Sequence, residues 1–206
     1  MIVKEFETYL ARFARGPSEM DLRVRGLRAE GHLPTVRGRH APPVTPLQAA
    51  MMILSVVAHR AVEAGSLASR IGALPVVPRA DLDIPDGETF AEYLASLISS
   101  PAAVAEVPRF HVEIPEDGRF ARVVFVDGKS ILFTGDQHVR QDLEQMPERY
   151  DSTGRHAFER RFYMSRSALA DAAHAISSAD IGRQVFEDGP PDPELDDASH
   201  AREVRD

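Results

Sequence analysis

The stretch that decides the fold reads TPLQAAMMILSVVA, residues 45–58, and it contains no charged side chain. Thr45, Pro46 and Gln48 mark a helix start, with a hydroxyl at the N-cap, a proline at the first helical position and a glutamine at the third. Gly65 follows as a residue that can take the left-handed conformation at a helix end. The sequence therefore predicts a helix between these signals that has no face meant for water and lies in the core.

Two helices are predicted before this one. Apolar residues at helical spacing indicate the first over residues 2–14, and Arg15-Gly16-Pro17 ends it. Ser18 then supplies a capping pattern for a second helix, Ser18–Glu30. On the second helix the apolar residues share one stripe, and the remaining circumference carries the arginines Arg23, Arg25 and Arg28. One side of this helix is expected to pack, and the other to be positively charged.

An arginine-bearing helix after a tight glycine-containing turn is typical of a helix-turn-helix, whose second helix enters the major groove. A solvated surface explains the arginines equally well, because arginine is common on surfaces. The loop after the helix favours DNA: Gly31 ends the helix, Leu33 can return to the core, and cations follow that suit phosphate or minor-groove contacts. The candidate DNA-binding residues are Arg23, Arg25, Arg28, His32, Arg37, Arg39 and His40.

The same region contains a longer pattern, made of Leu27-Arg28, Gly31, Leu33-Pro34, Gly38-Arg39, Ala41-Pro42, Thr45 and Ala49-Ala50. In this pattern, which covers about the first third of the chain, the protein resembles small helix-turn-helix-like, DNA-associated proteins of alphaproteobacterial prophages and related elements. The resemblance implies a phage-type role in association with DNA, and it implies no catalytic residue.

The charges are unevenly distributed along a chain whose net charge is −8. Residues 1–79 hold 11 Lys and Arg against 6 Asp and Glu, whereas residues 80–206 hold 13 against 26. A basic front favours nucleic-acid binding, although an ordinary domain with an acidic tail has the same asymmetry. The absence of cysteine, of an export signal and of an apolar run approaching ~20 residues leads us to expect a cytoplasmic protein that does not enter a membrane.

The second half predicts a sheet with helices. A helix near residues 88–100 precedes strands over 110–114, 120–126 and 130–134, and a further strand over 158–164 lies between helices over 137–146 and 165–176. Asp127-Gly128 predicts a two-residue type I′ hairpin, which needs positive φ at both positions. Arginines and aromatics around residues 155–166 suit either single-stranded nucleic acid or the two faces of a sheet, and we favour the sheet.

The predicted fold class is therefore α+β. An all-α, helix-turn-helix or winged-helix-like domain (1–72) is followed by a proline-rich linker (73–87), for which an edge strand over Pro75–Pro78 is the alternative. A small antiparallel sheet with helices on one face (88–178) comes next. The acidic residues 179–206 are expected to form a disordered tail.

Motifs that would indicate an enzyme are absent from the sequence, including a nucleotide-binding loop, a nucleophile elbow and a zinc-protease helix. His111 and Glu113 share one face of a predicted strand, which His138 and His156 could approach. These residues do not have the spacing that fixes metal ligands on one element. We therefore expect no metal, no cofactor and no catalytic residue.

The expected function is sequence-specific binding of double-stranded DNA by a homo-oligomeric, phage-type transcriptional regulator. One alternative is a small terminase-like packaging subunit, which would assemble into a ring. The other alternative is a non-DNA adaptor or inhibitor that binds a protein partner through the C-terminal domain.

Overall fold

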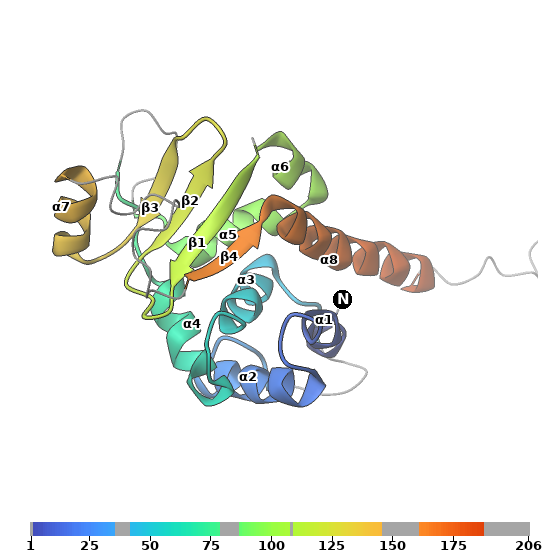
Figure 1. Cartoon of the computed structure of the whole chain (residues 1–206). Coiled ribbons are helices and arrows are strands. Elements are labelled where there is room, and N and C mark those ends of the chain that lie inside the picture. Colours follow the sequence, from blue (N-terminus) through green and yellow to red (C-terminus); the bar gives the residue numbers. More distant parts are fainter. Residues whose placement is uncertain (1, 36–41, 79–86, 108, 146–160, 188–206) are drawn as a thin grey trace, which may run out of the picture.

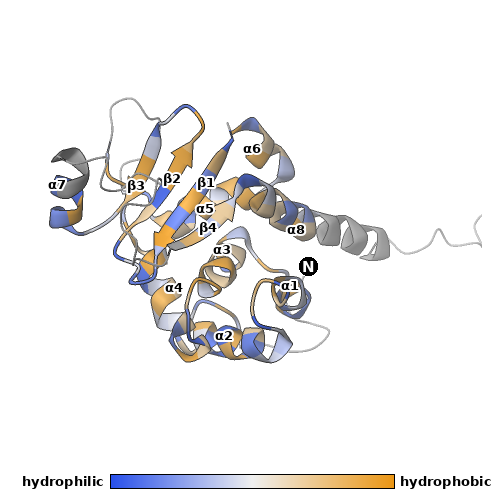
Figure 2. Ribbon diagram, in the orientation of Figure 1, coloured by the Kyte–Doolittle hydropathy of each residue, from blue (hydrophilic) through white to orange (hydrophobic). Residues whose placement is uncertain are grey.

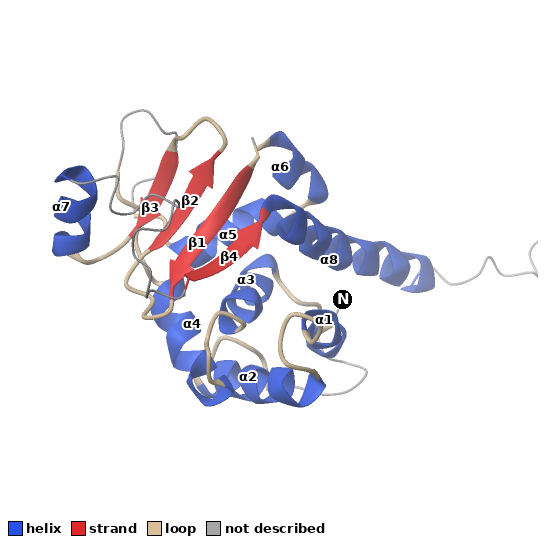
Figure 3. Cartoon of the chain, in the orientation of Figure 1, coloured by secondary structure: helices blue, strands red, loops and turns tan. Residues whose placement is uncertain are grey.

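The computed structural model describes residues 2–35, 42–78, 87–107, 109–145 and 161–187. Within these ranges the chain forms eight α-helices, a short 3-10 helix and a four-stranded antiparallel sheet, which confirms the mixed helix and sheet prediction (Figure 1, Figure 3). The helices are α1 (Val3–Leu10), α2 (Pro17–Ala29), α3 (Pro46–Ser55), η1 (Ala61–Glu63), α4 (Ala64–Gly72), α5 (Phe90–Ile98), α6 (Pro101–Glu106), α7 (Gln137–Gln145) and α8 (Arg166–Glu187). The strands are β1 (Phe110–Pro115), β2 (Ala121–Phe125), β3 (Ser130–Phe133) and β4 (Arg161–Ser165).

The ends of α2 confirm one prediction and correct another. The helix begins at Pro17 with Gly16 as its N-cap, so Ser18 lies inside the first turn and is not the cap. Proline suits this first position because its missing N–H would have no helical partner. At the other end the N–H of His32 donates to the Leu27 carbonyl at 2.9 Å, which closes the helix around Gly31 as predicted. Leu33 then returns to the core and is buried.

Helix α3 begins as the sequence predicts. The Thr45 hydroxyl accepts a hydrogen bond from the Gln48 N–H at 3.2 Å, and the Thr45 N–H donates to the Gln48 side chain at 3.1 Å. The predicted end at Gly65 is wrong, because α3 stops at Ser55 and Gly65 belongs to α4. A Cβ at Gly65 would lie 2.6 Å from the Gly26 carbonyl atoms. This glycine therefore permits the close approach of α2 and α4.

The sheet has the strand order β3-β2-β1-β4. Its β2–β3 hairpin forms at Asp127-Gly128 as predicted, but the turn is not type I′. Gly128 has φ +83°. Among the described residues only glycines have a positive φ, so the φ of Asp127 is negative. The Gly128 N–H donates to the Phe125 carbonyl and the Phe125 N–H to the Lys129 carbonyl. This pattern is that of a three-residue loop with a left-handed glycine, which needs only one positive φ.

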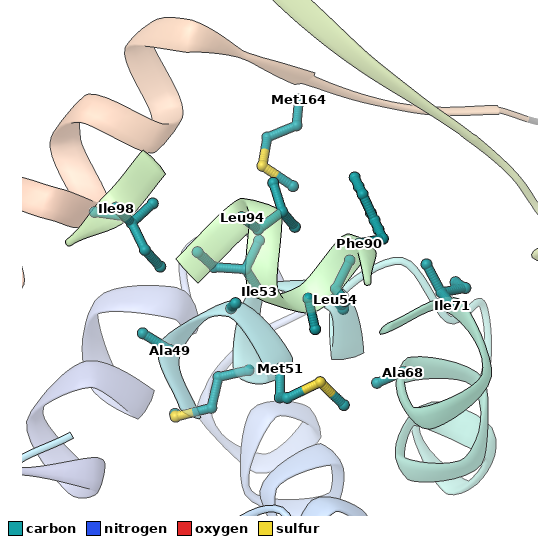
Figure 4. Close-up of a cluster of buried hydrophobic side chains, with 14 of the residues drawn as sticks. Ala49, Met51, Ile53, Leu54, Ala68, Ile71, Phe90, Leu94, Ile98 and Met164 are labelled. Carbon is teal, nitrogen blue, oxygen red and sulfur yellow. The ribbon is translucent and has the colours of Figure 1, made fainter. Parts of the chain in front are cut away.

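One hydrophobic core runs through both halves of the chain. Helix α5 lies between α3 and the sheet, and Figure 4 shows Leu94 of α5 between Ile53 of α3 and Met164 of β4. Phe90 of α5 contacts Phe133 of β3, with ring centroids 5.0 Å apart. Hydrophobic residues concentrate on the strands and on α5 behind them (Figure 2). The core thus crosses the boundary expected near residues 73–87.

The first residues of the predicted linker lie against the sheet. The Val77 N–H donates to the Leu132 carbonyl at 2.8 Å, and the Thr134 N–H donates to the Pro75 carbonyl at 2.9 Å. Leu74 and Val76 are buried. The segment Pro75–Pro78 therefore lies at the edge of the sheet, as the alternative prediction of an edge strand stated. Residues 79–86 of the predicted linker lie outside the described residues.

Helix α8 continues to Glu187, so the first part of the predicted disordered tail is helical. Residues 188–206, the remainder of that tail, lie outside the described residues. Among the helices that the structure describes, none combines the length and the apolar character needed to cross a membrane.

Candidate functional site

Arg23 does not lie on the outer surface of α2, contrary to the sequence-based expectation. Arg23 is 3% exposed, and its guanidinium donates to the Ala58 carbonyl at 2.8 Å and to the Ser55 carbonyl. It also forms an ion pair with Glu19. The carbonyls at the end of α3 have no partner within their own helix, and a buried guanidinium satisfies them. Arg23 is therefore held inside the protein as a helix cap.

The other candidate DNA-binding residues are not gathered into one exposed ridge. Arg25 is exposed and forms an ion pair with Asp21 at 2.5 Å. Arg28 is half-buried, and the ring of His32 is hydrogen-bonded to the Ser69 hydroxyl of α4 at 2.6 Å. Arg25 is thus the arginine of α2 whose guanidinium is largely open to solvent. Three further candidates, Arg37, Arg39 and His40, lie outside the described residues.

A different feature, which the sequence did not reveal, is a cavity of about 360 Å³ beside β4. It is enclosed by α1, the end of α3, strand β4 and the start of α8, which are far apart in the sequence (Figure 1). Most of its wall is apolar, with contributions from Ile53, Met164 and Leu169. This volume lies within the range of pockets that hold small ligands or single large side chains.

Two large aromatic residues of the cavity wall are exposed. Phe13, which follows α1, is 50% exposed, and Tyr163 of β4 is 54% exposed. Exposed aromatic residues beside an apolar hollow are common in interaction sites, where they supply contact area at a small cost in conformational entropy. No pattern in the sequence separates these two aromatics from core residues.

Tyr9 brings a polar atom to the cavity wall. Its hydroxyl is buried and has no hydrogen-bond partner among the described residues. Burial raises the pKa of this hydroxyl, and the nearby Arg12 guanidinium partly opposes that rise. The phenol is therefore neutral at physiological pH and can donate a hydrogen bond. A buried hydroxyl without a partner is costly, so an acceptor supplied by a ligand would be stabilising.

The face of β1 that carries His111 also holds a buried charged cluster. Glu113 is fully buried, and it accepts hydrogen bonds from Arg122 at 2.8 Å and from the His111 ring at 3.0 Å. This pairing compensates the charge of Glu113 and orients His111, which also lines the cavity. Within the described ranges there is no group of three or more His, Cys, Asp or Glu residues that could hold a metal ion. His156, which was considered for such a cluster, lies outside those ranges.

Comparisons with known protein families, with curated proteins and with solved structures find no match for this chain. The function proposed below therefore depends on the geometry and chemistry of the described residues.

Proposed function

We propose that this protein is an adaptor that binds a partner protein through the cavity beside β4. In this proposal an extended segment of the partner pairs with β4 along the edge that no described strand occupies, and it inserts an apolar side chain into the cavity. The proposal rests on one observation: an apolar cavity lies next to β4, an edge strand that pairs only with β1 among the described strands. Extended segments commonly add to such edges, with backbone hydrogen bonds giving affinity and pockets giving specificity.

The residues around the cavity suit this kind of binding. Phe13 and Tyr163 offer exposed aromatic area, while Met164 and Leu169 form a buried floor. Full burial of one large apolar side chain stabilises a complex by about 2–3 kcal/mol. Pairing along β4 adds backbone hydrogen bonds on the side of the strand that no described strand occupies. The cavity and the strand edge therefore support each other as parts of one site.

The proposal is tested with a random peptide library selected on the immobilised full-length protein. Enriched peptides are expected to show alternating apolar residues, because the side chains of an extended strand point alternately to its two faces. Hydrogen exchange at residues 161–165 is expected to slow when such a peptide binds. If no enriched peptide slows exchange along β4, the proposed site is wrong.

Two variants locate the binding of the enriched peptides. Ala168→Phe fills the cavity from α8 and is expected to weaken binding by about tenfold or more. Leu22→Ser is the control, because Leu22 is 46% exposed on α2 and does not line the cavity. Equal affinity for both variants would contradict insertion of a side chain into this cavity.

Binding of double-stranded DNA is a second candidate, because Arg25 is exposed and the chain segment with Arg37 and Arg39 begins soon after its helix. In this proposal α1 and α2 form the helix-turn-helix of a phage-type regulator, or the protein is a small terminase-like subunit. Duplex binding by the full chain is measured against salt concentration. Arg25→Ala or Arg37→Ala is expected to lower the log–log slope by about 0.9 per lost phosphate contact.

The exposed Arg60, which lies on the surface before η1, provides the control for that titration. Arg60→Ala is expected to leave the slope unchanged, and unchanged slopes in all three variants would remove the DNA contacts proposed here. Mass measurement separates the two DNA roles, since a dimer favours regulation and a closed ring favours packaging.

A further inference from the structure

Arg12 differs from most arginines of the protein because no described carboxylate pairs with its guanidinium. Its side chain is exposed, and it forms no ion pair with a carboxylate among the described residues. Five other arginines form ion pairs with carboxylates: Arg23, Arg25, Arg60, Arg119 and Arg122. Three more donate hydrogen bonds to backbone carbonyls: Arg70, Arg140 and Arg166.

The position of Arg12 is nevertheless fixed by its surroundings. The carbon of its guanidinium lies 4.0 Å from the centre of the Tyr9 ring and 4.7 Å from that of Phe13. Stacking on aromatic faces holds a guanidinium in place while leaving its N–H donors free. Tyr9 and Phe13 both line the cavity beside β4. A preorganised cation with free donors therefore lies at the mouth of an apolar cavity.

The Tyr9 hydroxyl adds a second donor at the same place. This hydroxyl is buried without a partner, and its neutral form persists because burial raises its pKa. Asp171 of α8 is close enough to contribute to that rise, but it forms no ion pair with Arg12 in the described structure. One acceptor with negative charge would satisfy both the hydroxyl and the guanidinium, and a carboxylate does so with two oxygens.

We propose that the cavity selects a partner segment in which a carboxylate lies directly beside the inserted apolar side chain. Arg12 binds the carboxylate, and the Tyr9 hydroxyl donates a hydrogen bond to it. This inference rests on the proposed adaptor function and names the chemistry of the segment. The carboxylate is that of an Asp or Glu side chain, because a segment paired along β4 continues past the cavity and presents side chains to it.

The test uses two fluorescent probes that share an apolar body and differ in charge. One is 8-anilinonaphthalene-1-sulfonate, whose sulfonate stands in for the carboxylate, and the other is neutral N-phenyl-1-naphthylamine. Arg12→Gln is expected to weaken binding of the sulfonate about tenfold and to leave the neutral probe unchanged. Arg15→Gln is the matched control, because Arg15 is also exposed but is not stacked on Tyr9 or Phe13, and it is expected to affect neither probe.

Ala168→Phe separates failure of this inference from failure of the proposed function. Filling the cavity is expected to weaken both probes. If neither probe responds to that variant, the cavity does not accept apolar groups and the adaptor proposal loses its support. If both probes respond to the filled cavity but the sulfonate is insensitive to Arg12→Gln, only the selection of a carboxylate is overturned.

The source of the carboxylate is decided by competition against the bound sulfonate probe. N-acetyl-phenylalanine presents a terminal carboxylate, N-acetyl-phenylalanyl-glutamate α-amide presents one on a side chain, and N-acetyl-phenylalanine amide presents none. The side-chain acid is expected to compete better than the amide. A terminal acid that competes better than the side-chain acid would overturn the assignment to Asp or Glu in favour of the partner's carboxyl terminus. Equal competition by all three compounds would overturn the selection proposed for Arg12 and Tyr9.

Discussion

The two edges of the sheet differ in whether another segment of the described chain pairs with them. At the β3 edge, backbone hydrogen bonds of 2.8–2.9 Å join Pro75 and Val77 to the strand and the residue that follows it. The same edge is backed by Phe90 and Tyr93, whose rings pack on Phe133. Beyond β4 no described strand is paired, and exposed aromatic residues and a cavity lie beside it.

This difference shows how a protein can treat one edge as structure and the other as surface. An unpaired edge is a template for association, so proteins usually cover or charge it. Here the chain covers the β3 edge with its own segment. The edge of β4 carries Tyr163 toward solvent instead, which suits binding better than protection.

Substitution of Val76→Asp should break the covered edge. Val76 is 5% exposed, and an ionised carboxylate there would be buried without a partner, so the free energy of unfolding should fall by about 3 kcal/mol. Urea denaturation measures the change. Val62→Asp is the matched control, because Val62 is 78% exposed and should tolerate the same change. Equal denaturation midpoints for the two variants would show that the β3 edge does not depend on this segment.

High pH should weaken the same edge through Tyr93. Burial raises the pKa of Tyr93 to about 12, with a contribution from the Glu88 carboxylate, whereas an unfolded tyrosine ionises near 10.0. The neutral phenol therefore contributes stability that is fully present below pH 10.0 and is lost as pH rises to about 12. The loss should reach about 2–3 kcal/mol at most, at about 1.4 kcal/mol per pKa unit.

Urea unfolding across this alkaline range measures the loss for the wild type and for Tyr93→Phe. The variant has no phenol to ionise, so its stability should decline less steeply. Parallel declines would assign the alkaline loss to other groups and would contradict the burial of the Tyr93 hydroxyl against β3.

Removal of the cap of α5 should loosen the covered edge by a smaller amount. The Thr89 hydroxyl accepts a hydrogen bond from the Glu92 N–H, and Thr89 also pairs with Pro75. Thr89→Ala should lower the free energy of unfolding by about 1 kcal/mol. Thr8→Ala in α1 is the control, because the Thr8 hydroxyl caps no helix and bonds the Lys4 carbonyl of its own helix. Thermal unfolding should rank the two variants in this order, and the reverse order would contradict the capping role of Thr89.

The β4 edge should tolerate the change that the other edge does not. Tyr163→Thr keeps a strand-forming residue at a position that is 54% exposed, so stability should change by less than about 0.5 kcal/mol. Binding of the neutral probe should nevertheless weaken, since an aromatic wall of the cavity is lost. A large loss of stability would show that Tyr163 is part of the core and not of a binding surface.

Local signals in the sequence predicted several elements well. Thr45, Pro46 and Gln48 fix the start of α3 because the cap needs only residues within one turn. Gly31 ends α2 and Leu33 returns to the core for similarly local reasons. The β2–β3 hairpin was placed correctly for the same reason, although its turn needs positive φ only at Gly128.

The orientation of Arg23 could not be predicted in this way. Helical spacing places Arg23 beside the apolar stripe of α2, but it does not show that the guanidinium reaches carbonyls at the end of α3, 32 and 35 residues later in the sequence. Gly65 was misjudged for a related reason, since its partner is the backbone of Gly26 in another helix. A sequence pattern shows what a residue can do locally, but it does not show which distant carbonyl or backbone it will meet.

By itself, the amino-acid sequence determined the uncharged core helix, its cap, the hairpin and the mixture of helices and strands, because these features depend on interactions between near neighbours. Only the tertiary structure decided that Arg23 is buried, that the β3 edge is covered and that Tyr9, Arg12 and Tyr163 meet beside a cavity. Each of these depends on packing between segments far apart in the chain, which periodicity and capping signals do not encode.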